Sequence, residues 1–181
     1  DDFSNALKVV IDRNYNLSAF MGRLADVVHL PLPHCAPTDI IPLIKSTQIM
    51  FSQQCAKRNI RWEEQFATTE FMVNIDSHQF EQMLINVVKN AYEAIDENGT
   101  ITINLNEEAG KVILSIEDSA GTLSALDESH LFQPFYTNKV DGQGIGLMLS
   151  REILNQHGFK YRFECKADQW TRFIIKMPLY I

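Results

Sequence analysis

Cysteine is scarce in this sequence, and the residues present follow no metal-binding or disulfide pattern. Cys35, Cys55 and Cys165 are odd in number, lie far apart and include no C-x-x-C pair. These features argue against a disulfide framework and against a structural zinc site. We therefore expect a protein of the reducing cytoplasm.

Positive charge and long hydrophobic runs are also in short supply. Lysine and arginine number 16 against 23 aspartate and glutamate residues, which gives a net charge of −7. No nucleic-acid partner is expected, because such binding depends on basic residues that meet phosphates, although a nucleotide pocket needs only local donors. No apolar run approaches the roughly 20 residues of a membrane span, and no signal peptide opens the chain. The first residues are Asp1-Asp2 rather than Met, which we interpret as a fragment of a longer protein.

Hydrophobic residues make up 45% of the 181 positions, enough for one sizeable domain with a short appendage. The appendage is a predicted helix over residues 3–28. Its seam follows a heptad spacing with one polar member: Phe3, Leu7, Val10, Asn14, Leu17, Met21, Leu24 and Val28. Such a helix spans about 39 Å, which favours an oligomeric bundle over packing on the chain's own core. Prolines then end the helix, and we place a boundary between residues 1–34 and 35–181.

The second region alternates predicted helices and strands. Helices are expected from Thr38-Asp39 to Lys57, from a cap at Asp76 or Ser77 to Ile95, and from Gly144 or Gly146 to His157-Gly158. Strands are expected over 60–66, 71–75, 100–105, 112–116, 160–165 and 171–176, with a turn through 107–110 and a long loop from Asp118 to Gly142. This order predicts an α/β (α+β) two-layer sandwich, in which a mixed β-sheet carries helices on one face.

Two polar features of this region could carry chemistry. Asn86 and Asn90 lie one helical turn apart, and asparagine is a poor helix former, so the pair favours ligands for a hard cation such as Mg²⁺. Taken alone, a solvated helix face explains them better. Asp118 ends a strand before small residues, where its carboxylate could accept from an exocyclic amino group. An ordinary aspartate turn explains Asp118 equally well.

A glycine cluster is the third feature. Gly142, Gly144 and Gly146 run from the long loop into a helix, an arrangement that lets backbone N–H groups and the helix N-terminus approach a phosphate. A dinucleotide-binding fold would need a strand immediately before these glycines. No G-x-x-x-x-G-K-S/T motif occurs, which excludes a P-loop enzyme.

Taken together and in this order, the motifs resemble the ATP-binding domain of sensor histidine kinases, in the superfamily that includes gyrase, Hsp90 and MutL. The similarity covers about residues 39–178 and is strongest over residues 82–91 (QMLINVVKNA) and 131–139 (LFQPFYTNK). It implies a Bergerat-type ATP-binding fold. Residues 1–34 also resemble the second helix and linker of the family's dimerisation and phosphoacceptor hairpin.

On the phosphate side, the resemblance implies that Asn90 coordinates Mg²⁺ between the phosphates of ATP, with Asn86 beside it. Lys139 would reach the γ-phosphate, and Phe132 and Phe135 would anchor a lid over residues 119–141 that orders on nucleotide binding. Further nucleotide contacts are expected from these residues: Lys89, Gly121, Gly142, Gly144, Ile145, Gly146 and Leu147.

On the adenine side, Asp118 would accept from the adenine amino group and Thr171 would lie nearby. The family motif Asp-x-Gly-x-Gly reads Asp118-Ser119-Ala120-Gly121-Thr122 here, and Trp170 stands where a glycine commonly precedes the threonine. Trp170 could narrow the adenine pocket or stack at its rim. These departures keep open a non-catalytic alternative, a kinase-like module that scaffolds a regulator.

The implied activity is that of a protein-histidine kinase in two-component signalling, a phosphoprotein that passes its phosphoryl group to a response-regulator receiver domain. Hydrolysing members usually carry glutamate at the position of Asn86, and an amide cannot act as a general base, so transfer fits better than hydrolysis. None of the five histidines precedes an acidic residue, as the acceptor pattern requires. We therefore expect the acceptor helix upstream of Asp1, on the same or a partner subunit of a homodimer, and no autophosphorylation by this chain alone. An ATPase or serine kinase of the same superfamily is the other alternative. The resemblance also implies that the chain is cytoplasmic, even if the full protein is a membrane-bound sensor.

Overall fold

The computed structural model describes residues 30–121, 144–165 and 170–180, together with eight single residues near the N-terminus. These eight are all helical: Ser4, Leu7, Lys8, Val10, Ile11, Asn14, Met21 and Gly22. They agree with the predicted helix over residues 3–28, the rest of which lies outside the described residues. Among the described helices, none combines the length and the apolar character that crossing a bilayer requires.

The described part of the chain contains every helix and strand predicted for it, with small shifts of their ends. The helices are α2 (Ile41–Lys57), α3 (Ser77–Ala94) and α4 (Gly146–Gln156). The strands are β1 (Ala36–Asp39), β2 (Arg61–Phe66), β3 (Met72–Ile75), β4 (Thr100–Glu108), β5 (Lys111–Asp118), β6 (Lys160–Cys165) and β7 (Thr171–Pro178). Strand β1 was not predicted.

The predicted helix start at Thr38-Asp39 is wrong, because both residues belong to β1, which pairs antiparallel with β3. Asp39 instead supports the start of α2 from outside the helix. Its Oδ1 accepts from the backbone N–H of Ile41 at 3.2 Å and from that of Phe71 at 3.0 Å. A single carboxylate thereby joins the beginning of α2 to the segment that leads into β3.

Helix α3 begins as its sequence predicts. Asp76 is the N-cap, and its Oδ1 accepts from the backbone N–H groups of His78 and Gln79, at 3.1 Å each. This satisfies donors that the first turn of a helix leaves without partners. At the other end, Nη1 of Arg58 donates to the carbonyl of Ile95 at 3.2 Å. Both ends of α3 are therefore held by side chains.

The larger sheet has the strand order β2-β4-β5-β7-β6. Strand β2 runs parallel to β4, and the other neighbours are antiparallel. Ala109 (φ 51°) and Gly110 (φ 71°) form the two-residue turn between β4 and β5, with the positive angles typical of a type I′ hairpin. The predicted turn over 107–110 is thus too long, because residues 107 and 108 still belong to β4.

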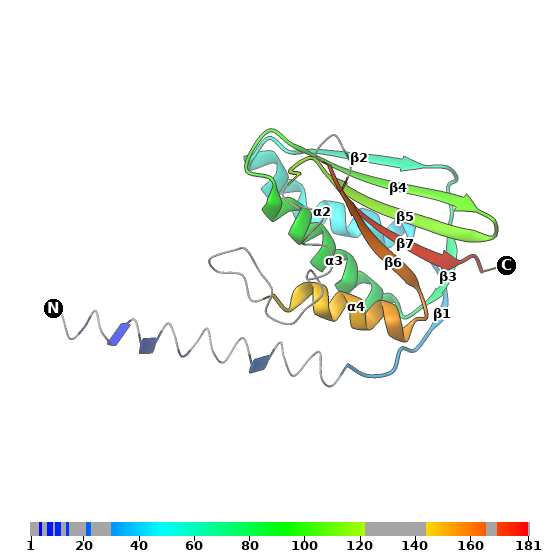
Figure 1. Ribbon diagram of the computed structural model, residues 1–181, viewed down its shortest axis with the longest axis horizontal. Helices are drawn as coiled ribbons and strands as arrows, with labels where there is room; N and C mark the ends of the chain where they lie inside the picture. The colour runs from blue at the N-terminus through cyan, green and yellow to red at the C-terminus, as the bar shows by residue number, and fades with distance from the viewer. Residues whose placement is uncertain are drawn as a thin grey trace.

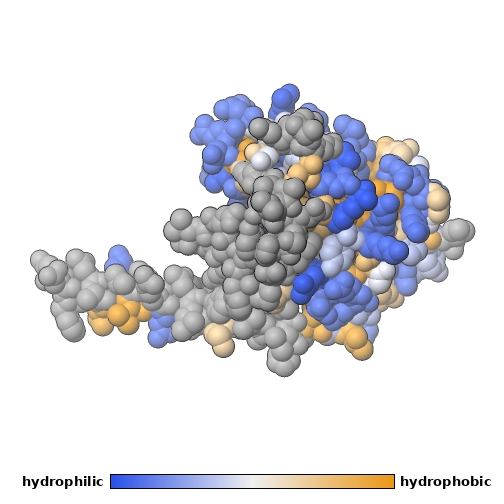
Figure 2. Space-filling model, viewed as in Figure 1, coloured by the Kyte–Doolittle hydropathy of each residue, from blue (hydrophilic) through white to orange (hydrophobic). Residues whose placement is uncertain are grey.

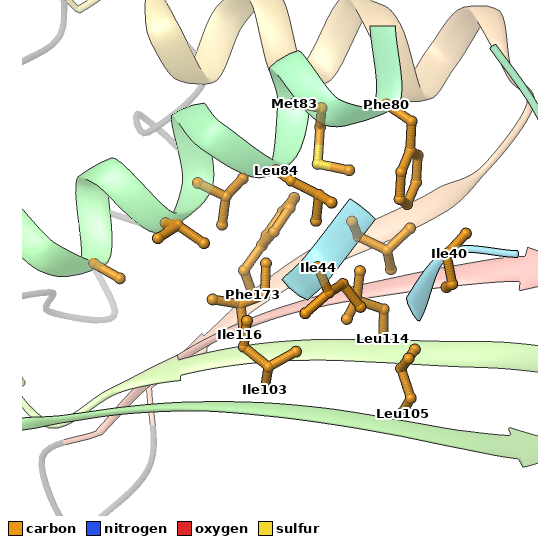
Figure 3. Packing of buried hydrophobic residues seen from close by; sticks show 14 of the residues in the cluster. Ile40, Ile44, Phe80, Met83, Leu84, Ile103, Leu105, Leu114, Ile116 and Phe173 are labelled. Atoms are coloured by element: carbon orange, nitrogen blue, oxygen red, sulfur yellow. The ribbon is translucent and has the colours of Figure 1, made fainter. Parts of the chain in front are cut away.

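All three helices lie on one side of this sheet, with α3 between α2 and α4 (Figure 1). Buried side chains from α3 and from the central strands meet in the layer between them (Figure 3). The labelled members of this core are Ile40, Ile44, Phe80, Met83, Leu84, Ile103, Leu105, Leu114, Ile116 and Phe173. The structure confirms the predicted two-layer architecture with a mixed sheet.

The sheet face away from the helices has no helix packed on it in the described structure (Figure 1). On β5, Val112, Leu114 and Ile116 join the core, while the residues between them point to the opposite face. Hydrophilic residues cover most of the described surface in the same view, with small hydrophobic areas between them (Figure 2).

Candidate functional site

Asn86 and Asn90 lie on the side of α3 that the core leaves open. The residues that bury the other side of the helix are Phe80, Met83, Leu84, Val87, Val88 and Ala91. Both asparagines are half-buried, and Asn86 lies beside the first residue of α4. Asn86 and Asn90 therefore lie one helical turn apart, as predicted, and both are partly shielded from solvent.

Asn86 faces the first residue of α4. A Cβ placed on Gly146 would lie 3.6 Å from Oδ1 and 3.8 Å from Cγ of Asn86, so the absence of a side chain at Gly146 leaves space next to the amide. Nδ2 of Asn86 is buried and has no hydrogen-bond partner among the described residues. Buried polar atoms without partners are rare, so this amide nitrogen needs an explanation.

The start of α4 presents backbone donors to the same place. Ile145 is the N-cap residue and makes no side-chain capping bond, and Gly144 has a left-handed φ of 62° that favours glycine. Ile145 is buried, and Leu147 packs against the core. These two residues can offer a ligand only their backbone, and the first N–H groups of a helix attract anions.

Asp118 and Thr171 form the last cross-strand pair of β5 and β7. They are 6% and 4% exposed, and the alternation along each strand puts both side chains on the helix side of the sheet. Oδ1 of Asp118 accepts from the backbone N–H of Ala120 at 3.1 Å. The two residues predicted for the adenine end are thus brought together at one edge of the helix layer.

The turn after Asp118 rests on two residues that sequence reasoning missed as site residues. Ser119 exchanges two hydrogen bonds with Thr100, since its N–H donates to the Thr100 carbonyl at 3.1 Å and its Oγ accepts from the Thr100 N–H at 2.9 Å. Gly99 fits below them, where a Cβ would lie 2.5 Å from Cγ2 of Ile95 and 2.9 Å from Oγ of Ser119. Gly121 follows with a left-handed φ of 59°.

Other predicted site residues lie apart from these or outside the described part. Lys89 is 56% exposed and its Nζ lies 3.7 Å from Oε1 of Glu93, one turn along α3. The following predicted residues fall within 122–143, outside the described residues: Thr122, Phe132, Phe135, Lys139 and Gly142.

The structure contradicts one of the two roles left open for Trp170, the narrowing of the adenine pocket. Trp170 precedes β7 and lines a hollow on the open face of the sheet, together with Arg172 and Lys176. Thr171 points the other way, to the helix side, because successive residues of a strand alternate. Trp170 therefore does not narrow the space beside Asp118.

The polar groups at Asn86 and Asn90 suit a metal ion whose other ligands are phosphate oxygens and water. Across the ranges that the structure describes, no group of three or more His, Cys, Asp and Glu residues could hold a metal ion by itself. Amide oxygens such as those of Asn86 and Asn90 are acceptable ligands for Mg²⁺, which usually keeps several waters and binds phosphates. An uncapped helix start beside these amides complements the phosphates.

The sequence is similar to a known protein family and to known proteins of that family. Residues 75–181 match the family described as histidine kinase-, DNA gyrase B- and HSP90-like ATPases. Sporulation kinase C of Bacillus subtilis is 28% identical over 76% of this chain and 32% of its own length. The sensor histidine kinase ZraS of Escherichia coli is 26% identical over 94% of this chain and 36% of its own length. The chain thus spans about a third of the length of these relatives.

A solved structure shows the same fold. The catalytic domain of the histidine kinase ThkA is 30% identical, with a TM-score of 0.75 over 81% of this chain and 96% of that domain. ThkA in complex with the response regulator TrrA gives a TM-score of 0.81 over 97% of this chain and 51% of that chain. The resemblance to sensor histidine kinases is confirmed. With the family matched over more than half of its residues, the chain belongs to the histidine kinase-, DNA gyrase B- and HSP90-like ATPases.

Proposed function

We propose that this chain binds ATP with Mg²⁺ and transfers the γ-phosphoryl group to a histidine, from which a response-regulator aspartate receives it. Residues 35–181 would be the catalytic domain, and residues 1–34 the second helix and linker of a dimerisation hairpin. The names of the relatives and the ThkA complex with a response regulator support this. The acceptor histidine would come from a hairpin helix of the same or a partner subunit, because no histidine here precedes an acidic residue.

The observation that carries the proposal is the meeting of Asn86 with the start of α4. The buried Nδ2 of Asn86 has no partner among the described residues, and Gly146 keeps the adjacent space open. A phosphate oxygen would accept from this amide and from the first N–H groups of α4. Polar groups from two separate helices would then hold one anion.

Asn90 would provide the amide oxygen for the metal, one turn further along α3. Bound Mg²⁺ would offset negative charge on the phosphates of ATP. Asn86, Asn90 and the α4 backbone would orient the phosphates, which is most of what phosphoryl transfer requires of a protein. Lys139 and the lid over residues 119–141 would complete the phosphate side, and this remains a prediction.

Asn86 also favours transfer over hydrolysis. An amide cannot remove a proton from water, so this position provides no general base. Asp118 and Thr171 would bind the adenine end, with the Asp118 carboxylate accepting from the exocyclic amino group. A reaction that consumes ATP fits a cytoplasmic location for the domain.

Calorimetric titration with ATP and Mg²⁺ tests binding. We expect saturable binding by the wild-type chain and at least about tenfold weaker binding by Asn90→Ala, since an interaction with a charged group is worth about 1.5–3 kcal/mol. Asn155→Ala, a change at an exposed asparagine near the far end of α4, is the matched control and should bind as the wild type does. No heat at millimolar nucleotide, or identical binding by Asn90→Ala, would overturn the proposal.

Product analysis tests the class of reaction. The chain is mixed with radiolabelled ATP and a separate hairpin protein that carries the acceptor histidine, and we expect an acid-labile, alkali-stable phosphoprotein. An acid-stable product would indicate a serine kinase, and release of inorganic phosphate without transfer would indicate an ATPase. Since Trp170 lines the other face of the sheet, the non-catalytic alternative now rests mainly on the departures at Ala120 and Thr122.

A further inference from the structure

A buried ion pair lies on the open face of the sheet, directly behind the adenine end of the proposed site. The hollow on this face has a volume of about 920 Å³. The lining residues that matter here are Asn104, Ser115, Glu117, Trp170, Arg172 and Lys176. Glu117 is 5% exposed although it carries a carboxylate, so it needs strong partners.

Three neighbouring strands supply those partners. Oε1 of Glu117 lies 2.8 Å from Nε of Arg172 on β7, an ion pair in which the N–H is not aligned as a hydrogen bond. The same oxygen accepts from Nδ2 of Asn104 on β4 at 3.0 Å and from Oγ of Ser115 on β5 at 3.2 Å. Because a buried charge that loses its partner is strongly destabilising, Glu117 holds these strands in the arrangement that keeps all the contacts.

The network continues to the edge of the sheet. Nη1 of Arg172 lies 3.9 Å from Oε2 of Glu164 on β6, and Nη2 of Arg162 lies 2.6 Å from Oε1 of the same glutamate. Arg162 is 56% exposed, so this outer pair contributes little by itself. It extends the charge network from Arg172 to the edge strand β6.

The strand register links this network to Asp118. Glu117 pairs with Arg172, and the next pair along the same two strands is Asp118 with Thr171. At this last pair β5 ends and β7 begins. A shift of one residue would move Asp118 to the open face and Glu117 toward the apolar core. The correct register is therefore the one in which Glu117 meets Arg172.

We propose that Glu117 and Arg172 are positioning residues for the adenine site: their ion pair fixes the ends of β5 and β7 so that Asp118 and Thr171 face the nucleotide. This rests on the proposed function. Neither residue touches the nucleotide, and both act through the residue next to them in the chain. The role of the pair is purine specificity, since Asp118 is the group that would distinguish an amino from an oxo substituent.

The test compares the binding of ATP and of inosine triphosphate, which carries a carbonyl in place of the adenine amino group. A site that hydrogen-bonds an amino group rejects the analogue that lacks it, so we expect the wild type to prefer ATP by at least about tenfold. Glu117→Gln keeps the shape of the side chain and removes its charge. We expect it to lose most of that preference through weaker ATP binding, with the affinity for inosine triphosphate within about twofold of wild type.

Two further variants make the result specific. The double change Glu117→Leu with Arg172→Leu replaces the ion pair by apolar residues, which often preserves stability. It should stay folded at the assay temperature and lose the preference as well. Lys176→Ala alters the same face of the same strand away from the pair and should keep the preference.

Each outcome bears on one proposal or on both. Folded Glu117 variants that keep the full preference would overturn the positioning role and leave the proposed function intact. An equal loss of both nucleotides would also overturn it, because that result indicates general loosening of the fold. A wild-type chain that binds neither nucleotide would overturn the proposed function, and this inference with it.

Discussion

The backbone N–H of Asp76 donates a hydrogen bond of 3.0 Å to Nε2 of His157 and so joins the beginning of α3 to the end of α4. Nδ1 of His157 lies 2.8 Å from the carbonyl of Ile153, so the proton is on Nδ1 and Nε2 accepts. The carboxylate of Asp76 also accepts from the N–H of His34 at 3.0 Å. The two helices of the proposed phosphate site and the segment that leads into the domain therefore meet at Asp76.

Removal of this carboxylate should destabilise the domain. Asp76→Ala removes the N-cap of α3 and the bond to His34, and we expect a loss of about 1–2 kcal/mol in the free energy of unfolding. Urea denaturation followed by circular dichroism measures it. Glu70→Ala, at an exposed acidic residue, is the matched control and should change stability by less than about 0.5 kcal/mol. Equal stability of the two variants would contradict the capping role.

The same residue predicts a dependence on pH. Burial raises the pKa of Asp76, but hydrogen bonds from the N–H groups of Gln79, His34 and His78 outweigh it and lower the pKa below its ordinary value. The stability that Asp76 contributes is therefore present above the unfolded pKa of about 3.9 and is lost as the pH falls through the lower folded value.

Asp76→Asn removes this titration, so the stability difference between wild type and variant should be constant near neutral pH and should shrink as the pH falls below about 4. Denaturant midpoints measured across that range give the difference directly. A difference that grows in acid would show that the carboxylate is not stabilised in the folded state.

Gly99 should be required for binding as well as for stability. A Cβ there would meet Ile95 at 2.5 Å and Ser119 at 2.9 Å, so Gly99→Ala should cost about 1–3 kcal/mol and displace the turn that follows Asp118. Gly110→Ala is the control, because that glycine also sits in a turn but has open space around it, and its φ of 71° costs only backbone strain. We expect both variants to lower the melting temperature and only Gly99→Ala to weaken ATP binding. Unchanged binding by Gly99→Ala would exclude a role for this turn.

Local patterns were sufficient where structure depends on neighbours in sequence. The Asp76 cap, the asparagine spacing on α3 and the start of α4 all follow from contacts within one or two turns of helix. Local patterns failed where an element pairs with a strand that is distant in the sequence. Strand β1 contains only Ala36–Asp39, and its pairing depends on β3. The face on which Trp170 lies and the burial of Glu117 depend on the register between β5 and β7, which no local pattern predicts.

Gly146 offers a change that separates function from stability. In Gly146→Ala the new Cβ would lie 3.6 Å from Oδ1 of Asn86, an ordinary contact distance, so the fold should accept it. Alanine is the better helix former by about 1 kcal/mol in a helix interior, so at the first position of α4 we expect equal or slightly higher stability. The methyl group would nevertheless fill the space beside Oδ1 and Cγ of Asn86, from which it would lie 3.6 and 3.8 Å. We expect ATP binding to weaken by about five- to tenfold, because the methyl group would keep the phosphate away from the Asn86 amide. Thermal denaturation and calorimetry on the same sample measure both effects, and undiminished ATP affinity would show that the phosphates do not approach α3 at this point.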